Sequence, residues 1–344
     1  MLKKILALIV LAVTGITTAS YACTRIVYRG DSNLYIIGRS LDWKTPIPTN
    51  LYVYPRGVKF ASSSRAGAFS WTSRYGAVYA VGYDAGITEG MNEKGLQVAS
   101  LFCKTAQYSD STNNNRRPVS LAVFVAWLLD SNETTDQVLR QVEKQDFTLA
   151  GSTFDGGTET KLHFGVTDRF GASAIIEFEA GKIHTYRTDS INAMSNDPEW
   201  PQMSAIVQYW RNVGGVNMLP GTVRSADRCV RGAFFADNVD KVADADLGAS
   251  ITRSVMFNVS VPYLYTVKGE PNVSSTQWRS LCNLRDLRYY FDIATANGLF
   301  YIDLGKCDLK PGAPVLKLVT ADCTDVTGMA NRHLRKAEPF VPIH

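Results

Sequence analysis

The sequence predicts an α+β protein built in layers, and three observations carry that prediction. Short runs of β-branched and aromatic residues, most of them bounded by Gly, Asp or Asn, predict strands. Apolar residues at helical spacing predict helices in other parts of the chain. The strands come in blocks and the helices are grouped between them, which is typical of packed layers of sheets and helices.

The expected elements follow one another in a definite order. The expected strands cover residues 23–28, 34–39, 69–83, 96–102, 162–167, 174–178, 299–303 and 314–319. The expected helices cover residues 121–129, 135–142, 206–213 and 226–239. Thr134 directly precedes the second helix, and its hydroxyl is expected to cap the first N–H groups of that helix.

The first two strands are expected to form a β-hairpin, because they flank a short polar stretch that contains a Gly-Asp pair. If Tyr28 pairs with Leu34, antiparallel register places Arg39 opposite Cys23. Asp42 then follows within reach of Cys23. The hairpin therefore predicts a thiol, a guanidinium and a carboxylate in one small region.

Residues 1–22 are expected to be an export signal that is removed from the mature protein. Two lysines precede an apolar run at residues 5–13, and residues 20–22 (Ser-Tyr-Ala) resemble an A-x-A cleavage site. The run is too short to span a bilayer. Cleavage makes Cys23 the first residue of a single mature domain, residues 23–344, which is expected to be periplasmic or secreted.

A lipoprotein signal is the alternative interpretation of this segment, with Cys23 acylated after cleavage. That signal needs a leucine-like residue three positions before the cysteine and a small residue two before, but the chain has Ser20 and Tyr21 there. No later apolar stretch approaches 18 residues, so no membrane association is expected after cleavage. The net charge of +4 includes both lysines of the signal, and nothing in this charge predicts a nucleic-acid partner.

Six cysteines are too few for a disulfide scaffold in a chain of this length. An exported protein nevertheless has the opportunity to pair some of them. The sequence leaves open whether disulfides form among Cys103, Cys229, Cys282, Cys307 and Cys323.

An N-terminal cysteine carries a nucleophile and a base on one residue. Its α-amine, with an ordinary pKa near 8, can accept the thiol proton close to neutral pH, so no histidine is required. This chemistry suits amide hydrolysis through an acyl-enzyme. Asp42 is a candidate to hold the amine and Arg39 to favour the thiolate, while N–H donors would meet the oxyanion. Alternatively, Arg39 and Asp42 form a surface ion pair, and Cys23 is an arbitrary first residue or a disulfide partner.

Five segments, taken in chain order, resemble the choloylglycine hydrolase family, which contains penicillin V acylases and conjugated bile acid hydrolases of the N-terminal-nucleophile class. Two further segments, Ser260-Val261-Pro262-Tyr263 and Ser275-Thr276-Gln277-Trp278-Arg279, resemble its Gram-negative branch. The resemblance implies a four-layer αββα sandwich and a homotetramer. The five segments are Cys23-Thr24-Arg25, Gly38-Arg39-Ser40-Leu41-Asp42-Trp43, Gly90-Met91-Asn92-Glu93-Lys94-Gly95-Leu96, Met194-Ser195-Asn196-Asp197-Pro198, and Leu219-Pro220-Gly221-Thr222 with Ala226-Asp227-Arg228.

The resemblance also implies roles for individual residues. Cys23 matches the nucleophile of the family, and its freed amine matches the base. Arg39 and Asp42 match an arginine and an aspartate that flank the thiol and orient the amine. Asn196 matches the asparagine that stabilises the oxyanion, and Arg228 matches a second active-site arginine that stabilises charge in the transition state.

Phe102 departs from the pattern of the bile-acid-hydrolysing relatives, which tend to carry Asn at the corresponding position, and is closer to the aromatic residue of penicillin V acylases. A phenyl ring cannot donate to an oxyanion, so the donors are expected to be Asn196 and a backbone N–H. An aromatic side chain here favours a flat apolar acyl group such as phenoxyacetyl. The alternative is that Phe102 packs in the core, because strand alternation leaves its facing open.

The resemblance predicts hydrolysis of a small-molecule linear amide, with penicillin V as the expected substrate and conjugated bile salts and acyl-homoserine lactones as alternatives. A papain-like hydrolase would need a catalytic histidine, and none of the four lies in a recognisable catalytic context. No metal-ligand spacing, phosphate loop or dinucleotide motif is present, so no metal or cofactor is expected. A non-catalytic exported binding protein is the alternative from another class. The four histidines are His163, His184, His333 and His344.

Overall fold

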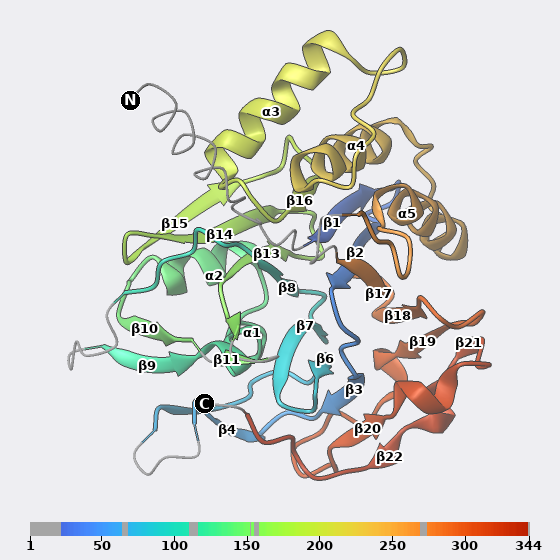
Figure 1. The fold of residues 1–344 in the computed structure, drawn as a ribbon. Coiled ribbons are helices and arrows are strands. Elements are labelled where there is room, and N and C mark those ends of the chain that lie inside the picture. Colours follow the sequence, from blue (N-terminus) through green and yellow to red (C-terminus); the bar gives the residue numbers. More distant parts are fainter. Residues whose placement is uncertain are drawn as a thin grey trace, which may run out of the picture.

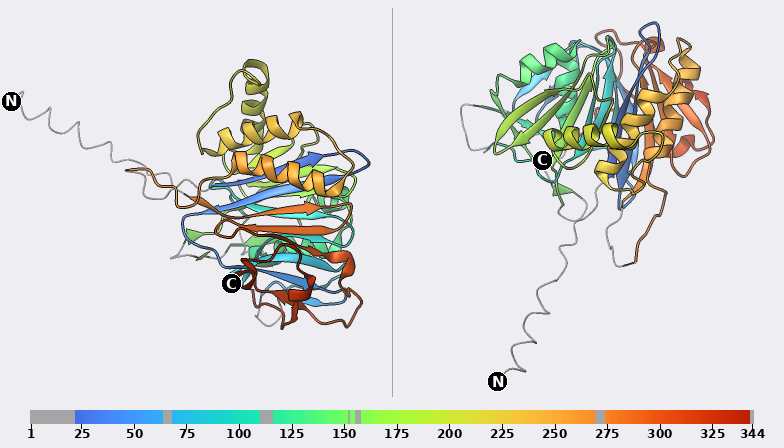
Figure 2. Two further views of the ribbon diagram at one scale, coloured as in Figure 1. Left: turned by 90° about the vertical axis from the view of Figure 1, so that its right-hand side faces the viewer. Right: turned by 90° about the horizontal axis from the view of Figure 1, so that it is seen from above.

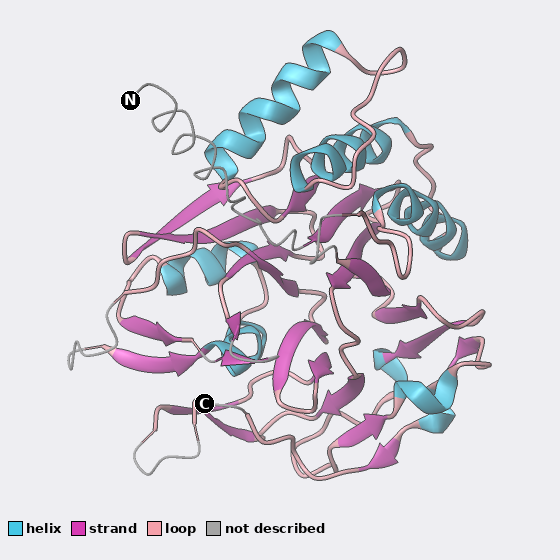
Figure 3. Ribbon diagram, in the orientation of Figure 1, coloured by secondary structure: helices cyan, strands magenta, loops and turns pink. Residues whose placement is uncertain are grey.

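Two large β-sheets lie face to face at the centre of the computed structural model, and helices cover the outer side of each (Figures 1 and 2). The structure describes residues 22–63, 68–109, 116–151, 153–154, 158–268 and 274–342. The expected export signal lies outside the described residues except for Ala22. Figure 3 separates the helices from the strands by colour.

The first sheet has seven strands in the order β16-β1-β2-β17-β18-β19-β21. All neighbouring pairs are antiparallel except β19 and β21. Its strands are β16 (Ala193–Ser195), β1 (Ala22–Arg29), β2 (Tyr35–Trp43), β17 (Ser275–Asn283), β18 (Arg288–Ile293), β19 (Leu299–Asp303) and β21 (Gly328–Met329).

The second sheet has nine antiparallel strands in the order β15-β14-β13-β8-β7-β6-β3-β20-β22. Its strands are β15 (Lys182–Arg187), β14 (Ser173–Glu179), β13 (Leu162–Thr167), β8 (Gln97–Phe102), β7 (Gly86–Asn92), β6 (Ala77–Gly82), β3 (Thr49–Tyr54), β20 (Leu316–Leu318) and β22 (Arg335–Lys336).

The α-helices of the described residues form the two outer layers. The helices α1 and α2 pack on the nine-stranded sheet, while α3, α4 and α5 lie over the seven-stranded sheet (Figure 2). The helices are α1 (Leu121–Ser131), α2 (Thr135–Val142), α3 (Trp200–Val213), α4 (Ser225–Asn238) and α5 (Ala245–Val259).

Short elements complete the described part of the chain. They comprise three two-stranded sheets and three 3₁₀ helices. The strands pair as β9 (Arg117–Ser120) with β10 (Phe147–Ala150), β11 (Thr153–Phe154) with β12 (Thr158–Glu159), and β4 (Lys59–Ala61) with β5 (Ser70–Thr72); the 3₁₀ helices are η1 (Leu304–Lys306), η2 (Thr320–Cys323) and η3 (Asn331–His333).

Apolar clusters in the described part of the chain hold the layers together. Side chains such as Val27 and Val78 pack between the two sheets. Ile26 packs toward α3, α4 and α5, and Val98 packs toward Phe124 of α1. Each fully buried side chain of this size stabilises the fold by about 1.5–3 kcal/mol. The molecule is therefore a four-layer αββα sandwich, as the family resemblance implies.

Several expected elements have the predicted bounds. The helix at residues 135–142 and the strands at 162–167 and 299–303 are confirmed residue for residue. The Thr134 hydroxyl accepts from the Gln137 N–H, so the predicted cap is confirmed as well. In the described part of the chain, no helix has the length and apolar character needed to cross a membrane.

The expected strand at residues 69–83 is wrong, because the structure breaks it into β5 and β6. The break falls at residues 73–76, where the Arg74 N–H leaves the sheet to donate to the Asp130 carbonyl. Gly76 has no room for a side chain there, since a Cβ would come within 2.9 Å of Leu309. The chain thus turns from one small sheet into the nine-stranded sheet.

The hairpin between β1 and β2 is confirmed, but its predicted register is wrong by two residues. Cys23 lies opposite Leu41, and Arg39 lies opposite Arg25. The turn is tighter than expected, because Leu34 N–H donates to the Asp31 carbonyl (3.1 Å) across only two intervening residues. A two-residue shift preserves the side-chain alternation of the strand, so Arg39 stays on the same face of the sheet as Cys23.

Candidate active site

Cys23 is the second residue of β1, a central strand with β16 on one side and β2 on the other. Its side chain is buried and packs with Ala99 and Leu101 of β8, so it lies between the two sheets. Alternation places the next side chain, Thr24, on the opposite face, where its hydroxyl accepts from Arg228 of α4. Groups from both faces of the sheet therefore meet around one end of β1.

Arg39 projects between the sheets, on the Cys23 side. One guanidinium nitrogen donates to the Ser100 carbonyl (2.8 Å), and another lies 3.5 Å from the Glu89 carboxylate. The guanidinium also lies over the Trp278 ring, 4.9 Å from its centroid. Sequence reasoning missed Glu89, because residues 86–92 are of mixed polarity and give no clear local signal for a buried ion pair.

Asp42 projects to the helical side of the sheet, and its main chain lies opposite Ala22 at the beginning of β1. Its carboxylate accepts from the hydroxyls of Thr276 (2.6 Å) and Ser40 (3.2 Å). Burial raises the pKa of Asp42, while the nearby Arg228 guanidinium (3.6 Å) opposes that change. The carboxylate is thus fixed beside the position where the expected cleavage would expose an amine.

The expected alternative of a surface ion pair between Arg39 and Asp42 is wrong. Their side chains are only 2% and 0% exposed. They are three residues apart in β2 and so lie on opposite faces of the sheet. Each has its own oppositely charged partner, Glu89 for Arg39 and Arg228 for Asp42.

Arg228 lies in the first turn of α4. Its side chain reaches the start of β1 from the helix-covered side of the seven-stranded sheet. Its guanidinium donates to the Cys23 carbonyl (2.8 Å) and to the Asn196 side-chain oxygen (3.1 Å). Its Nε donates to the Val223 carbonyl (2.9 Å). Burial lowers the pKa of Arg228, and Asp42 opposes this shift. Arg228 therefore joins three segments that lie far apart in the sequence.

Asn196 directly follows β16 and connects Cys23 to Phe102. Its side-chain oxygen accepts from the Cys23 backbone nitrogen (2.5 Å), and its amide nitrogen donates to the Phe102 carbonyl (2.7 Å). An amide NH₂ has two hydrogens, so the second remains available to an acceptor near the thiol. The structure therefore brings together Cys23, Asn196 and Arg228, which the sequence places in three separate motifs.

The Cys23 sulfur lies 4.0 Å from the Asp42 carbonyl oxygen. Burial raises the pKa of the Cys23 thiol, and the Arg39 guanidinium opposes that rise most strongly. Asp42 adds to the increase, while Arg228 acts against it. Two buried cations near one thiol are an arrangement that favours the thiolate once solvent or an amine can accept the proton.

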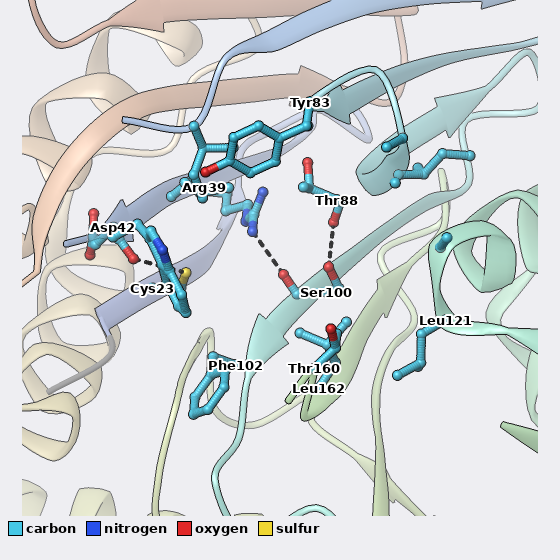
Figure 4. A pocket seen from close by; sticks show the side chains of 18 residues that line it. Cys23, Arg39, Asp42, Tyr83, Thr88, Ser100, Phe102, Leu121, Thr160 and Leu162 are labelled. Atoms are coloured by element: carbon cyan, nitrogen blue, oxygen red, sulfur yellow. Dashed lines mark hydrogen bonds between the residues drawn. The ribbon is translucent and has the colours of Figure 1, made fainter. Parts of the chain in front are cut away.

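A cavity of about 130 Å³ opens at the Cys23 thiol and is lined mainly by apolar side chains. In Figure 4 the cavity extends from Cys23 at one end to Leu121 of α1 at the other. Phe102 lines it near the thiol and packs against Trp43, with the ring centroids 6.0 Å apart. The side chain of Phe102 therefore belongs both to the core and to the cavity wall.

His163 lies away from the thiol of Cys23 and pairs with Glu177 (3.1 Å). Burial alone would lower the pKa of His163, but the Cys103 thiol and the Glu177 carboxylate raise it to about 10. Among the described residues that line the Cys23 cavity, none is a histidine. His344 lies outside the described residues. The papain-like alternative thus finds no support in the geometry.

All six cysteines are free thiols in the structure. The sequence left disulfides open, and the structure has none among the cysteines, all of which lie in the described ranges. Cys23 is the cysteine that lines the cavity. The thiols named as candidates for pairing are Cys103, Cys229, Cys282, Cys307 and Cys323.

The four-layer sandwich is the fold of the N-terminal-nucleophile hydrolase type, and Cys23 lies at the start of one of its interior strands. Comparison with known proteins agrees. Residues 23–328 match the family described as linear amide C–N hydrolases, choloylglycine hydrolase family. The chain therefore belongs to the choloylglycine hydrolase family and is an amidohydrolase acting on linear amides.

Individual relatives are similar over almost their whole length. A penicillin V acylase from Pectobacterium atrosepticum is 33% identical, over 98% of this chain and 96% of the relative. The solved structure of a penicillin V acylase from Agrobacterium tumefaciens superposes with a TM-score of 0.86 at 36% identity, covering 93% of this chain and 99% of the other. A conjugated bile acid hydrolase variant from Clostridium perfringens shares the fold, with a TM-score of 0.72 at 19% identity over 94% and 99% of the two chains.

Proposed function

We propose that the mature protein begins at Cys23 and hydrolyses linear amides like a penicillin V acylase, with Cys23 as both nucleophile and base. Export to the periplasm or beyond would remove residues 1–22 and free the α-amine. The observation that carries the proposal is the contact of the Cys23 nitrogen with Asn196, next to the buried Arg228 and Asp42. The family match, which begins at residue 23, also supports it.

In the first step, the α-amine of Cys23 takes the thiol proton, and the sulfur attacks the carbonyl carbon of the amide substrate. A carbon–sulfur bond forms and the carbonyl π electrons move onto oxygen. The second hydrogen of the Asn196 amide is placed to donate to this oxyanion. Arg228 holds the Asn196 oxygen and the Cys23 carbonyl, so it acts by fixing both reacting groups.

In the second step, the carbon–nitrogen bond breaks and the protonated α-amine gives its proton to the leaving nitrogen. The acyl group remains on the sulfur as a thioester. A water molecule then attacks the thioester carbonyl, the α-amine accepts a proton from that water, and the acid leaves as the thiol is restored. Arg39 favours the thiolate on the side of the cavity, and Asp42 supports the amine and Arg228 on the helical side.

The cavity favours a small, flat, apolar acyl group. Its volume of about 130 Å³ is similar to the roughly 150 Å³ apolar cavity that holds a single benzene ring. Phenoxyacetyl fits that scale, whereas the four fused rings of a cholyl group do not. Penicillin V is therefore the preferred substrate, and the similar proteins from Pectobacterium atrosepticum and Agrobacterium tumefaciens are both penicillin V acylases by name. Acyl-homoserine lactones and conjugated bile salts are the alternatives.

Hydrolysis of penicillin V, a conjugated bile salt and an acyl-homoserine lactone should be measured side by side for the wild type and for Cys23→Ala. We expect penicillin V to be cleaved fastest by the wild type, and no turnover of any substrate by the variant. A binding protein without catalysis would give no turnover in either form and equal ligand affinity. The homotetramer that the resemblance implies stays a prediction, which light scattering would check.

A further inference from the structure

The turn between β6 and β7 has a backbone conformation that is unfavourable for one of its central residues, Tyr83. Tyr83 and Asp84 both have positive φ values, 55° and 51°, and the Ala85 N–H donates to the Gly82 carbonyl (3.0 Å). Positive φ at both central residues is typical of a type I′ turn, which prefers Asn and Gly. A bulky aromatic residue rarely adopts this conformation. Something other than local preference therefore holds Tyr83 in place.

The β1–β2 turn shows the same conformation in a more suitable sequence. Its central residues, Ser32 and Asn33, have φ values of 53° and 58°. Both are small and polar, both are exposed, and neither lines the Cys23 cavity. This turn serves as an internal control for the β6–β7 turn, because its two central residues also have positive φ but do not line the Cys23 cavity.

Asp84 anchors the β6–β7 turn to two neighbouring strands. One carboxylate oxygen accepts from the Asn50 amide (2.9 Å) and from the Tyr52 hydroxyl (3.1 Å), both on β3. The other oxygen accepts from the Lys317 ammonium (2.6 Å) on β20. Three donors from two strands thus hold one carboxylate, which fixes the turn against the nine-stranded sheet.

Tyr83 is also fixed to the segment that follows β2. Its backbone N–H donates to the Pro48 carbonyl (2.7 Å), and its hydroxyl donates to the Pro46 carbonyl (3.2 Å). Ile47, between these two prolines, lines the same cavity as Tyr83. In Figure 4 the Tyr83 ring extends across the cavity on the side of Arg39. The turn therefore contributes a partly exposed aromatic side chain to the lining of the cavity.

We propose that Tyr83 is a specificity-determining residue that packs against the acyl group, and that Asp84 is a positioning residue that holds Tyr83 there. The proposal rests on the proposed function, in which the acyl group occupies this cavity. Strained backbone that surrounding contacts hold in place clusters at functional sites, where the strained residue takes part in the function. A fixed aromatic face favours flat aromatic acyl groups over flexible aliphatic ones, because stacking needs little further ordering.

The test compares penicillin V with an aliphatic acyl penicillin of similar length, so that both substrates release the same amine. Tyr83→Asn removes the ring, and Asn tolerates positive φ. We expect this variant to lower the ratio of kcat/KM for the aromatic over the aliphatic substrate roughly tenfold, mainly through KM. Asp84→Gly keeps the turn but removes the carboxylate that holds it. The ratio of kcat/KM for the aromatic over the aliphatic substrate should therefore fall by a smaller factor than in Tyr83→Asn.

Asp84→Asn is the conservative variant, because its side-chain oxygen can still accept from Asn50 and Tyr52, and its ratio should lie closer to the wild type. Asn33→Gly is the matched control in the β1–β2 turn, and its ratio should not change. Thermal unfolding of each variant identifies any loss of folding. An unchanged ratio in folded Tyr83→Asn and Asp84→Gly proteins would overturn the inference. A wild type that cleaves neither penicillin would instead overturn the proposed function on which it rests.

Discussion

The polar side and the apolar side of Cys23 are built in different ways. On the polar side, Asp42, Arg228 and Asn196 are buried and have several hydrogen-bonding partners each. On the apolar side, the cavity is formed by side chains such as Phe102 and Leu121 from a strand end and a helix. The comparison teaches that the chemistry and the choice of substrate are carried by separate groups.

The difference follows from the cost of burying charge. A buried ion is stable only when it is paired and hydrogen-bonded, so each polar group constrains the next, and a change at one displaces the others. An apolar wall has no such requirement and tolerates changes of shape. We therefore expect substitutions on the polar side to reduce kcat strongly, and substitutions on the apolar side to alter selectivity by smaller factors.

The largest effect is expected for Asn196→Ala. Loss of an oxyanion donor should lower kcat by roughly 10²–10³, with little change in KM, because the interaction is made mainly in the transition state. Asn192→Ala is a matched control, since Asn192 is also buried and bonded to Arg29 and Asp237 but lies away from Cys23. Steady-state kinetics on penicillin V checks this. Equal losses of kcat in both variants would show that the polar side has no special role.

Arg228→Lys should give the next largest effect. A lysine keeps the positive charge beside Asp42 but cannot reach the Cys23 carbonyl and Asn196 at the same time. Misplacement of the reacting groups should lower kcat about 100-fold. Arg231→Lys, about one turn later in α4, removes contacts to the backbone carbonyls of Pro220, Thr222 and Asn258, none of which touches Cys23, and serves as the control.

A variant Arg228→Lys that retains wild-type kcat would break the distinction between the two sides. Circular dichroism and thermal unfolding of both lysine variants show whether the fold is preserved. A loss of activity in Arg231→Lys of the same size would assign the effect to α4 as a whole.

Phe102→Leu tests the apolar side. The smaller side chain should reduce kcat/KM for penicillin V about tenfold relative to an aliphatic acyl penicillin, because the change removes an aromatic ring from the cavity wall. Phe164→Leu, in the core beneath α1 and outside the cavity, controls for a general packing defect. The comparison would fail if Phe102→Leu lowered turnover of both substrates equally and as strongly as Asn196→Ala.

The smallest effect on catalysis is expected at His163, whose pairing with Glu177 lies outside the cavity. The pKa of His163 is raised from 6.5 to about 10 in the folded protein. The folded state therefore binds the proton more tightly, and this contribution to stability is complete below pH 6.5 and lost as the pH rises through 10. His163→Gln should lower the unfolding temperature at pH 6 and much less at pH 10. A difference that is the same at both pH values would contradict this.

The sequence predicted the part of the site formed by the β1–β2 hairpin better than the rest, because the residues of a hairpin are close together in the sequence. Cys23, Arg39 and Asp42 belong to one hairpin, so strand alternation and turn position were enough to bring them together. Their register was wrong by two residues, because a polar stretch does not show how many of its residues the turn uses. A shift by two keeps side chains on their faces, and the prediction of a shared region survived it.

Asn196 and Arg228 came only from the family resemblance. They lie 173 and 205 residues from Cys23 in the sequence, and no local pattern encodes contacts of that separation. Glu89 was missed for the same reason. The helix α5 was missed although Asp244 caps it and apolar residues recur along it at helical spacing, so this omission was avoidable from the sequence.

The most direct measurement is the rate of penicillin V hydrolysis by two forms of the protein, one that starts at Cys23 and one that retains Ala22. We expect the first form, verified by mass spectrometry, to be active and the second to be inactive, because its Cys23 nitrogen is an amide without a basic lone pair. Equal rates for the two forms would show that the free amine of Cys23 takes no part in the reaction.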